Sequence, residues 1–126
     1  MPTALKFYVI VFGTPEEVYR ALTIPLSIQL WTGEAAEMSM EPGSEFSLYN
    51  GNICGKSLEF EENKKIVQEW YFGDQEEPSI VTYKMHPDKK GNSLEVRQTN
   101  VPDEIVEEFK SGWENELLPD LQEFFE

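Results

Sequence analysis

The chain contains one histidine and one cysteine, the two residue types that most often serve as metal ligands or in nucleophilic catalysis. His86 stands before Pro87 in a predicted turn, and Cys54 follows a predicted hairpin; no second histidine or cysteine is near either one in the sequence. Zinc sites and activated thiols need such residues in groups. A pairing of these two residues in the fold stays open. We nevertheless expect no metal, no cofactor and no catalytic residue, and a binding protein more than an enzyme.

Two glutamines are better placed for a function. Gln68 and Gln98 alternate in phase with Trp70 and Val96 along two predicted strands, so each amide points where apolar residues point. A buried amide without partners costs about 1–3 kcal/mol. Each glutamine is therefore either a satisfied member of the core, paired with a neighbour or a water molecule, or the polar end of an otherwise apolar pocket.

The C-terminal segment, residues 104–126, predicts a long helix that must lie on an apolar surface. Its large apolar residues recur every three or four positions and form one stripe. They are Ile105, Phe109, Trp113, Leu117, Leu121 and Phe124. Burying them is worth on the order of 10 kcal/mol, which exceeds what helix propensity supplies. We therefore expect a broad apolar sheet beneath this stripe.

Two residues inside this helix break local rules. Gly112 costs about 1 kcal/mol in a helix interior, so we expect backbone from the short helices, near Trp31, to approach it closely. Pro119 removes an N–H group and crowds the preceding turn. Because the apolar stripe continues past it, we expect a kink between Asn115 and Pro119, with Phe124 still buried.

Strands and turns fill most of the remaining chain. Apolar and alternating runs predict strands near residues 5–12, 35–40, 45–49, 52–61, 65–73, 79–86 and 93–100. After the first strand, Thr14, Pro15 and Glu17 form a capping box that opens a helix, and a second short helix follows. Asn50 and Gly51 predict a type I′ hairpin turn. This order predicts an α+β protein, with a curved antiparallel sheet of six or seven strands wrapped around the C-terminal helix and two short helices between strands 1 and 2.

A net charge of −14 argues against several classes of partner. Residues 103–126 hold nine carboxylates against Lys110, and nucleic acid or anionic membrane would be repelled, because such binding rests on neutralising phosphates. The acidic helix face either keeps the protein in solution or docks a basic partner. We expect one domain, residues 1–126, and no apolar run reaches the roughly 20 residues of a membrane span. One cysteine and the lack of a signal-peptide pattern favour the cytoplasm.

Six motifs occur in an order that covers essentially the whole chain. They are PEEVYRALT (15–23), LWTG (30–33), GSEFSLYNGNICG (43–55), IVQEW (66–70), QTNVP (98–102) and GWENELLPDL (112–121). In these motifs the chain resembles the helix-grip superfamily of START and Bet v 1-like domains (SRPBCC). Within it, the chain is similar to the family homologous to the C-terminal domain of the heat-shock-protein-90 ATPase activators. The resemblance implies the helix-grip fold, in which many members bind hydrophobic ligands between sheet and helix and some are aromatase/cyclases.

On this resemblance we expect a cavity between the sheet and the C-terminal helix. The residues expected to line it are Trp31, Gln68, Trp70, Tyr83, Gln98, Phe109, Trp113 and Leu117. The implied function is non-catalytic binding of a small hydrophobic or aromatic ligand. One alternative is a chaperone-associated or stress-response interaction domain, with a chaperone-like partner reached through the acidic surface. Another is a cyclase- or hydrolase-like enzyme on the same fold.

Overall fold

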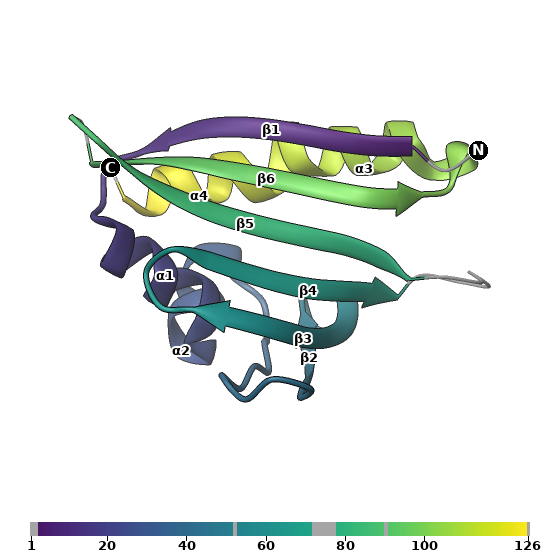
Figure 1. Ribbon diagram of the computed structural model, residues 1–126, viewed down its shortest axis with the longest axis horizontal. Coiled ribbons are helices and arrows are strands. Elements are labelled where there is room, and N and C mark those ends of the chain that lie inside the picture. The colour runs from purple at the N-terminus through teal and green to yellow at the C-terminus, as the bar shows by residue number, and fades with distance from the viewer. Residues whose placement is uncertain (1–2, 52, 72–77, 90, 126) are drawn as a thin grey trace.

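The protein folds as a curved sheet with its helices on one face (Figure 1). The computed structural model describes residues 3–51, 53–71, 78–89 and 91–125. The strands are β1 (Thr3–Val11), β2 (Glu45–Leu48), β3 (Ile53–Glu61), β4 (Lys65–Tyr71), β5 (Ser79–Asp88) and β6 (Gly91–Val101). Neighbouring strands are antiparallel in the order β1-β6-β5-β4-β3-β2. The predicted α+β helix-grip class is confirmed, with six strands in the described part of the chain.

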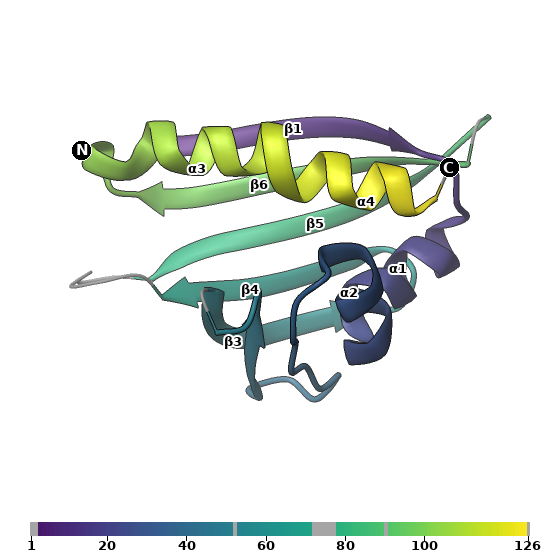
Figure 2. The same cartoon turned by 180° about the vertical axis from the view of Figure 1, so that it is seen from behind.

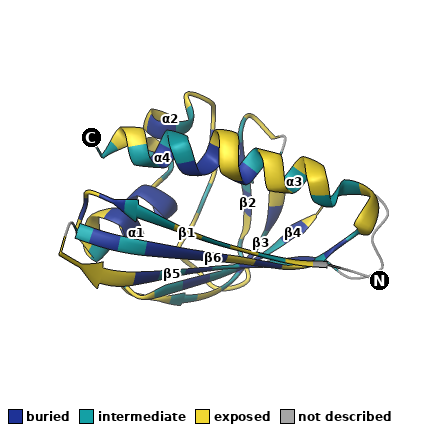
Figure 3. Cartoon of the chain, turned by 90° about the horizontal axis from the view of Figure 1, so that it is seen from above, coloured by how far each residue is buried: buried dark blue, intermediate teal, exposed yellow. Residues whose placement is uncertain are grey.

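Two short helices and one long C-terminal helix cover the concave face of the sheet. The short ones are α1 (Pro15–Thr23) and α2 (Pro25–Thr32). The long one is built of η1 (Asp103–Ile105), α3 (Val106–Gly112), η2 (Trp113–Leu117) and α4 (Leu118–Phe124). The long helix lies over β1 and β6, and α1 and α2 cover the end of the sheet where α4 lies (Figure 2). In the described ranges, no helix therefore covers the convex face of the sheet (Figure 3).

The capping box predicted at the start of α1 is confirmed. The Thr14 hydroxyl accepts the Glu17 backbone N–H at 3.2 Å, and the Glu17 carboxylate accepts the Thr14 N–H at 3.0 Å. The helix α2 is joined back to α1 by Trp31, whose indole N–H donates to the carbonyl of Ala21 at 2.7 Å. This bond fixes the angle between the two short helices, and Gly33 ends α2 with a left-handed φ of 75°.

Alternation along the central strands decides which side chains face the helices. In β4, Ile66, Gln68 and Trp70 are buried, whereas the residues between them are partly exposed. The same pattern in β5 and β6 places Tyr83 and Val96 inside. The predicted inward and outward positions in these strands are thus confirmed, and the two glutamines do point into the core.

The strand predicted at residues 35–40 is wrong, since only Glu37 pairs with the edge of the sheet, opposite Ser47 in an isolated bridge. The chain then enters turns in which the Ser39 hydroxyl accepts the Glu41 N–H and the Ser44 hydroxyl donates to the Glu41 carbonyl. Serine side chains that bond nearby backbone groups compete with a strand ladder for those groups. The predicted strand 65–73 ends in the structure at Tyr71, and residues 72–73 lie outside the described residues.

Where a kink was predicted, between Asn115 and Pro119, the helix contains a π-helical turn. The N–H of Leu118 donates to the carbonyl of Trp113, five residues earlier, and the chain continues as a helix to Phe124. Pro119 follows directly after this turn, where the backbone already departs from ordinary pairing between residues four apart. The extra residue of the π turn thus reduces the conflict between the proline ring and the turn before it.

The π turn also changes which side chains face the core. Leu121 stays buried, but Phe124 is 39% exposed, so its predicted burial is wrong. Phe125 packs against the core instead, with its ring beside Gly13. A π turn inserts one residue into the helix period. The last apolar contact of the stripe therefore moves from Phe124 to Phe125.

The close approach predicted at Gly112 is also wrong. A Cβ atom there would meet nothing within 4 Å beyond the helix's own backbone. Gly112 has ordinary helical angles, with φ −60° and ψ −45°. Trp31 bonds and packs elsewhere, against Ala21 and Tyr49. Gly112 is therefore not needed for packing against a neighbouring backbone.

The hairpin between β2 and β3 forms, but its turn is shifted by one residue from the predicted position. The central residues with positive φ are Tyr49 (50°) and Asn50 (57°), and the Gly51 N–H donates to the Leu48 carbonyl at 3.2 Å. A bulky side chain at positive φ is uncommon. Tyr49 adopts this conformation where its ring packs edge-on against Trp31, with centroids 6.5 Å apart.

Candidate functional site: the interface between sheet and C-terminal helix

The space between the sheet and the C-terminal helix is filled by aromatic rings. Trp70 from β4 and Trp113 from η2 stack with centroids 5.3 Å apart. Tyr83 from β5 meets Trp113 edge-on at 6.1 Å, and Phe7 from β1 lies 6.2 Å from Trp113 on its other flank. Phe109 lies 6.4 Å from Trp70. Four of the predicted lining residues, Trp70, Tyr83, Phe109 and Trp113, are thus brought together as one packed group.

Gln98 completes the interior hydrogen bonding of Trp113. Its amide oxygen accepts the indole N–H of Trp113 at 2.8 Å, and its amide nitrogen donates to the Ser79 hydroxyl at 3.2 Å. That hydroxyl in turn donates to the carbonyl of Thr99 at 2.6 Å. Because Gln98 is fully buried, this chain of bonds avoids the cost of an unpaired amide.

Gln68 has the same role toward the other stacked ring. Its amide oxygen accepts the indole N–H of Trp70 at 3.0 Å, and Gln68 is 1% exposed. Among the residues that the structure describes, its amide nitrogen has only the weak acceptor Met38, with the sulfur 4.0 Å away. The Ser57 hydroxyl contacts the same sulfur at 3.7 Å. Each glutamine thus pairs with a different tryptophan, which fits the alternative of satisfied core residues.

Trp31 and Leu117 occupy other parts of the predicted lining. Trp31 packs on Tyr49 at the end of the molecule where α2 meets α4, and within the described ranges its ring makes no contact with the stacked pair. Leu117 is buried on the last residue of η2. The eight predicted residues therefore lie along the whole interface between sheet and helix rather than around one chamber.

Sequence reasoning missed a second group of polar side chains at the α4 end of this interface. The Tyr49 hydroxyl is buried and lies near the Asp120 carboxylate, but it reaches hydrogen-bond geometry with no described residue. The pKa of Tyr49 is raised, chiefly by burial and then by the charges of Asp120 and Glu116. Burial, with a smaller effect of the Tyr49 hydroxyl, raises the pKa of Tyr83.

Asp120, on α4, belongs to the same group as Tyr49 and Tyr83. Its pKa is raised, chiefly by burial and then by the neighbouring carboxylates of Glu123 and Glu116, while the Tyr49 hydroxyl opposes that shift. Tyr49 reaches this position only through the shifted turn. Since the sequence favoured Asn50 and Gly51 as the turn, it held no signal that would place Tyr49 beside α4.

A shallow cleft opens at the edge of the interface, between α3 and the strands β3 and β4. It has a volume of about 220 Å³. Its lining residues are Ile53, Trp70, Glu108, Phe109, Gly112, Glu116 and Leu117. Three predicted lining residues, Trp70, Phe109 and Leu117, contribute to it. Ligand pockets in proteins usually hold about 300 Å³ or more, so this cleft suits a side chain or a small fragment.

A larger hollow lies outside the predicted site, between α1 and the turn that joins β3 to β4. It has a volume of about 390 Å³. Tyr19, Ile24 and Phe60 give it apolar walls, and Glu16 and Glu62 stand among its polar residues. Burial and the charge of Glu62 raise the pKa of Tyr19. The sequence pattern gave no hint of this hollow, because its residues come from three separate segments.

The lone cysteine and the lone histidine lie apart from this interface. Cys54 is exposed on β3, and its thiol contacts the Gly51 carbonyl at 3.3 Å. His86 belongs to β5 rather than to a turn, and its Nε2 lies 3.3 Å from the Glu95 carboxylate. Within the described residues, no three of the His, Cys, Asp and Glu side chains are grouped as metal ligands would be.

Comparison with known proteins fits this architecture. The family model described as activator of Hsp90 ATPase homolog 1-like protein matches residues 13–126. The chain belongs to this family. The human activator of 90 kDa heat shock protein ATPase homolog 1 is 28% identical over 116 residues, which cover 89% of this chain and 34% of that protein. The chain spans about a third or less of the length of the curated relatives that it matches most significantly.

Solved structures share the helix-grip fold. An Hsp90 activator from Plasmodium falciparum superposes with a TM-score of 0.82 at 24% identity, covering 96% of this chain and 93% of that one. The Aha1 dimer from Colwellia psychrerythraea gives a TM-score of 0.87 at 15% identity, covering 98% and 96%. At these identities the likeness shows the fold alone. None of the helices described for this chain is both long enough and apolar enough to cross a membrane.

Proposed function

We propose that this domain is a protein-interaction domain that binds a 90-kDa heat-shock chaperone through its surface. Its family membership supports a chaperone-type partner, since the matching family and the human relative are named as activators of that chaperone's ATPase. We propose in addition that residues 1–126 form one domain and that the protein acts in the cytoplasm.

The observation that carries the proposal is the filled interior. Trp70 and Trp113 stack on each other, and their indole N–H groups are bonded to Gln68 and Gln98. A ligand entering this space would have to separate the rings and break bonds that are costly to leave unmade inside a protein. A packed and hydrogen-bonded interior favours a domain that acts through its outer surface.

Isothermal titration calorimetry with the purified chaperone tests this proposal. We expect saturable binding, measured without nucleotide and with a non-hydrolysable ATP analogue. An unrelated acidic protein of similar size and net charge is the control, and it should give no binding heat. The proposal would be contradicted if the chaperone gave the same binding heat with the control protein as with this domain, or no binding heat with either.

Binding of a small hydrophobic or aromatic ligand is a second candidate, supported by the cleft beside Trp70, Phe109 and Leu117. Gly112 lies on the rim, where the absence of a side chain leaves room for an incoming group. Native mass spectrometry of the protein as purified tests this candidate. A retained small molecule that is lost in Gly112→Leu would favour it, and a mass equal to the bare chain in every preparation would count against it.

A further inference from the structure

The convex face of the sheet carries a cluster of positive charge in a protein whose net charge is −14. The strands alternate so that Lys6 from β1, Lys84 and His86 from β5, and Arg97 from β6 point away from the helices. We call these four residues, with Glu95 at their centre, the basic outer patch. Only ten lysines and arginines occur in the chain, so three of them in one patch is a marked concentration.

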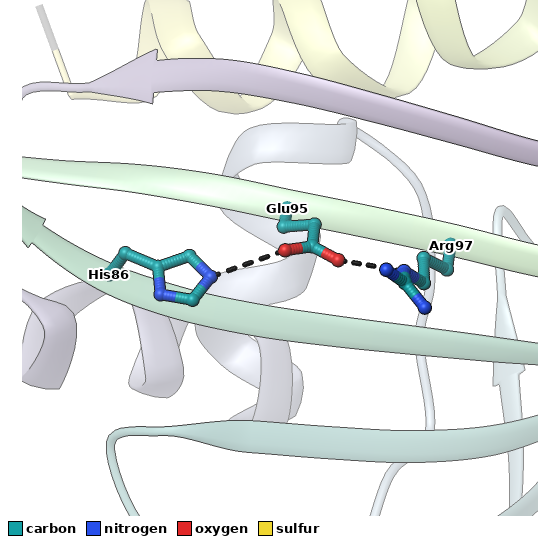
Figure 4. Close-up of polar contacts among 3 residues, drawn as sticks. All are labelled: His86, Glu95 and Arg97. Carbon is teal, nitrogen blue, oxygen red and sulfur yellow. Dashed lines mark hydrogen bonds and ion pairs between the residues drawn. The ribbon is translucent and has the colours of Figure 1, made fainter.

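Glu95 organises this patch. It is only 7% exposed although it lies on the open face of the sheet. Its carboxylate accepts Arg97 Nε at 2.8 Å and lies 3.3 Å from His86 Nε2 (Figure 4). Burial opposes ionisation of Glu95, but the hydrogen bonds from His86 and Arg97 outweigh it and lower the pKa of Glu95. One fixed carboxylate thus orients two of the donors.

The remaining donors of the patch are available to a partner. Arg97 uses Nε for Glu95, and a terminal nitrogen of its guanidinium points away from that carboxylate (Figure 4). In the part of the chain that the structure describes, Lys84 has no ion-pair partner. Lys6 lies over the ring of Tyr8, with Nζ 5.2 Å from the centroid. Lys6 is exposed and Lys84 partly exposed, and cations that form no ion pair within the described residues are suited to an anionic partner.

The register of the sheet places like charges directly opposite each other. Lys6 lies opposite Arg97, and Lys84 lies opposite Lys65 on β4, which is itself paired with Glu59 at 3.2 Å. On its other side Lys84 lies opposite Glu95, the one carboxylate of the patch. Like charges directly across two strands destabilise a sheet. Negative groups placed between them would remove that repulsion. Glu95 offsets part of this repulsion, and the positive charge that it leaves uncompensated favours a complex with an acidic partner.

From these observations we infer that the basic outer patch docks an acidic segment of a partner protein, laid across strands β1, β6, β5 and β4. Three inter-strand spacings of about 4.8 Å give a path of about 14 Å, which about four extended residues can follow. The exposed ring of Tyr8 offers an apolar contact at one end of this path. The inference rests on the proposed function only in taking the partner to be a protein.

A second copy of this chain is a poorer occupant, although its C-terminal helix is acidic. The helix covers one face of the sheet (Figure 3), and the alternation of the strands points the patch residues away from that face. A helix-on-patch contact would therefore join copies head to tail, and such contacts extend into filaments unless a rotation closes them. Repulsion between two chains of net charge −14 opposes the same contact. An acidic segment of another protein avoids both problems.

A fluorescently labelled oligoglutamate peptide tests the inference without the chaperone. We expect the wild-type domain to bind it, with ¹H–¹⁵N chemical-shift changes concentrated at Lys6, Lys84, His86 and Arg97. The double variant Lys6→Gln/Lys84→Gln leaves the bonds to Glu95 intact and should bind about threefold more weakly or worse. The matched double variant Lys89→Gln/Lys110→Gln removes the same charge elsewhere and should bind like the wild type.

Three results would overturn the inference. The matched control could lose as much affinity as the patch variant, which would show attraction by overall charge alone. Single-stranded DNA could bind as tightly as the peptide, which would make the patch a surface for nucleic acid. The shift changes could also lie outside the patch. If the chaperone fails to bind but the peptide binds as described, the proposed function fails and this inference stands. If the chaperone binds but the peptide does not, the proposed function stands and this inference fails.

Discussion

At the scale of single residues, Trp113 is the side chain on which the interior depends most. It stacks on Trp70, touches Phe7 and Tyr83, and donates its indole N–H to Gln98. It is 1% exposed. Its removal would leave a large cavity and would deprive the buried amide oxygen of Gln98 of its hydrogen-bond donor.

Trp113→Ala should therefore lower the free energy of unfolding by about 3–5 kcal/mol. Trp113→Phe keeps most of the ring but leaves the Gln98 oxygen unpaired, and should cost about 1–3 kcal/mol. Chemical denaturation measures both. Glu114→Ala, on the exposed face of the same turn, should change stability by less than about 0.5 kcal/mol. Equal losses for Trp113→Ala and Glu114→Ala would show that the helix presents a different face to the sheet.

Asp120 gives a prediction that depends on pH. Its pKa in the folded protein lies above the ordinary 3.8, because burial and then Glu123 and Glu116 disfavour the charge. The folded state then binds the proton more tightly than the unfolded state, so this group costs stability as pH rises through the raised pKa. Asp120→Asn should raise the melting temperature at neutral pH, and the gain should vanish well below pH 3.8, where the carboxyl is protonated in both states.

Melting curves of the wild type and Asp120→Asn across this pH range provide the test. Glu114→Gln removes one exposed negative charge from the same helix and serves as the control for net charge. A gain of the same size at every pH, or an equal gain in Glu114→Gln, would contradict the assigned role of Asp120.

At the scale of elements, the π turn decides which residues of α4 pack. It makes Phe125 the last core contact of the helix and leaves Phe124 39% exposed. Phe125→Ala should therefore cost about 1–3 kcal/mol, because the ring is only partly buried. Phe124→Ala should cost less than Phe125→Ala. Urea denaturation of the two variants compares them, and a larger loss for Phe124→Ala would indicate an uninterrupted α-helix.

Gly112 provides a second prediction for the C-terminal helix. It has helical angles and open space around its missing side chain. Gly112→Ala should stabilise the protein by about 0.5–1 kcal/mol, since alanine loses less backbone entropy in a helix. Thermal unfolding measures the change. A destabilised variant would mean that the cleft at Gly112 closes more tightly than described.

The sequence predicted those elements that depend on short-range patterns. The capping box at Thr14, the alternation in β4 to β6 and the apolar stripe up to Leu117 follow from local spacing, and all are present. Features set by competition between segments could not be read in the same way. The π turn depends on Pro119 together with the packing of Phe125, and the shifted hairpin depends on contacts of Tyr49 with Trp31.

The sequence predicted which residues lie in the candidate site better than it predicted whether they enclose a cavity. Polar residues in phase with apolar ones identified Gln68 and Gln98 as buried, and they are. Whether such residues line a chamber or fill a core depends on ring positions and distances, which spacing along the chain does not contain. The basic outer patch was missed because its members come from three strands, and their proximity depends on the register of the sheet.

At the scale of the whole molecule, the acidic helix and the basic outer patch belong to opposite faces of the sheet. The C-terminal helix, which lies on one face (Figure 3), is rich in carboxylates, and the patch residues point away from that face. Between them lies a core of stacked and hydrogen-bonded rings. Such a molecule can contact proteins on either side without opening its interior.

The three tryptophans allow this claim to be measured directly, because Trp70 and Trp113 lie in the interior and Trp31 lies near α4. The measurement is ¹⁹F NMR of the domain labelled with 5-fluorotryptophan, with the purified 90-kDa chaperone added stepwise. We expect all three signals to broaden as the domain joins a larger particle, while the shifts of Trp70 and Trp113 stay unchanged. Signals that never broaden, or a selective shift of Trp70 and Trp113, would contradict the account.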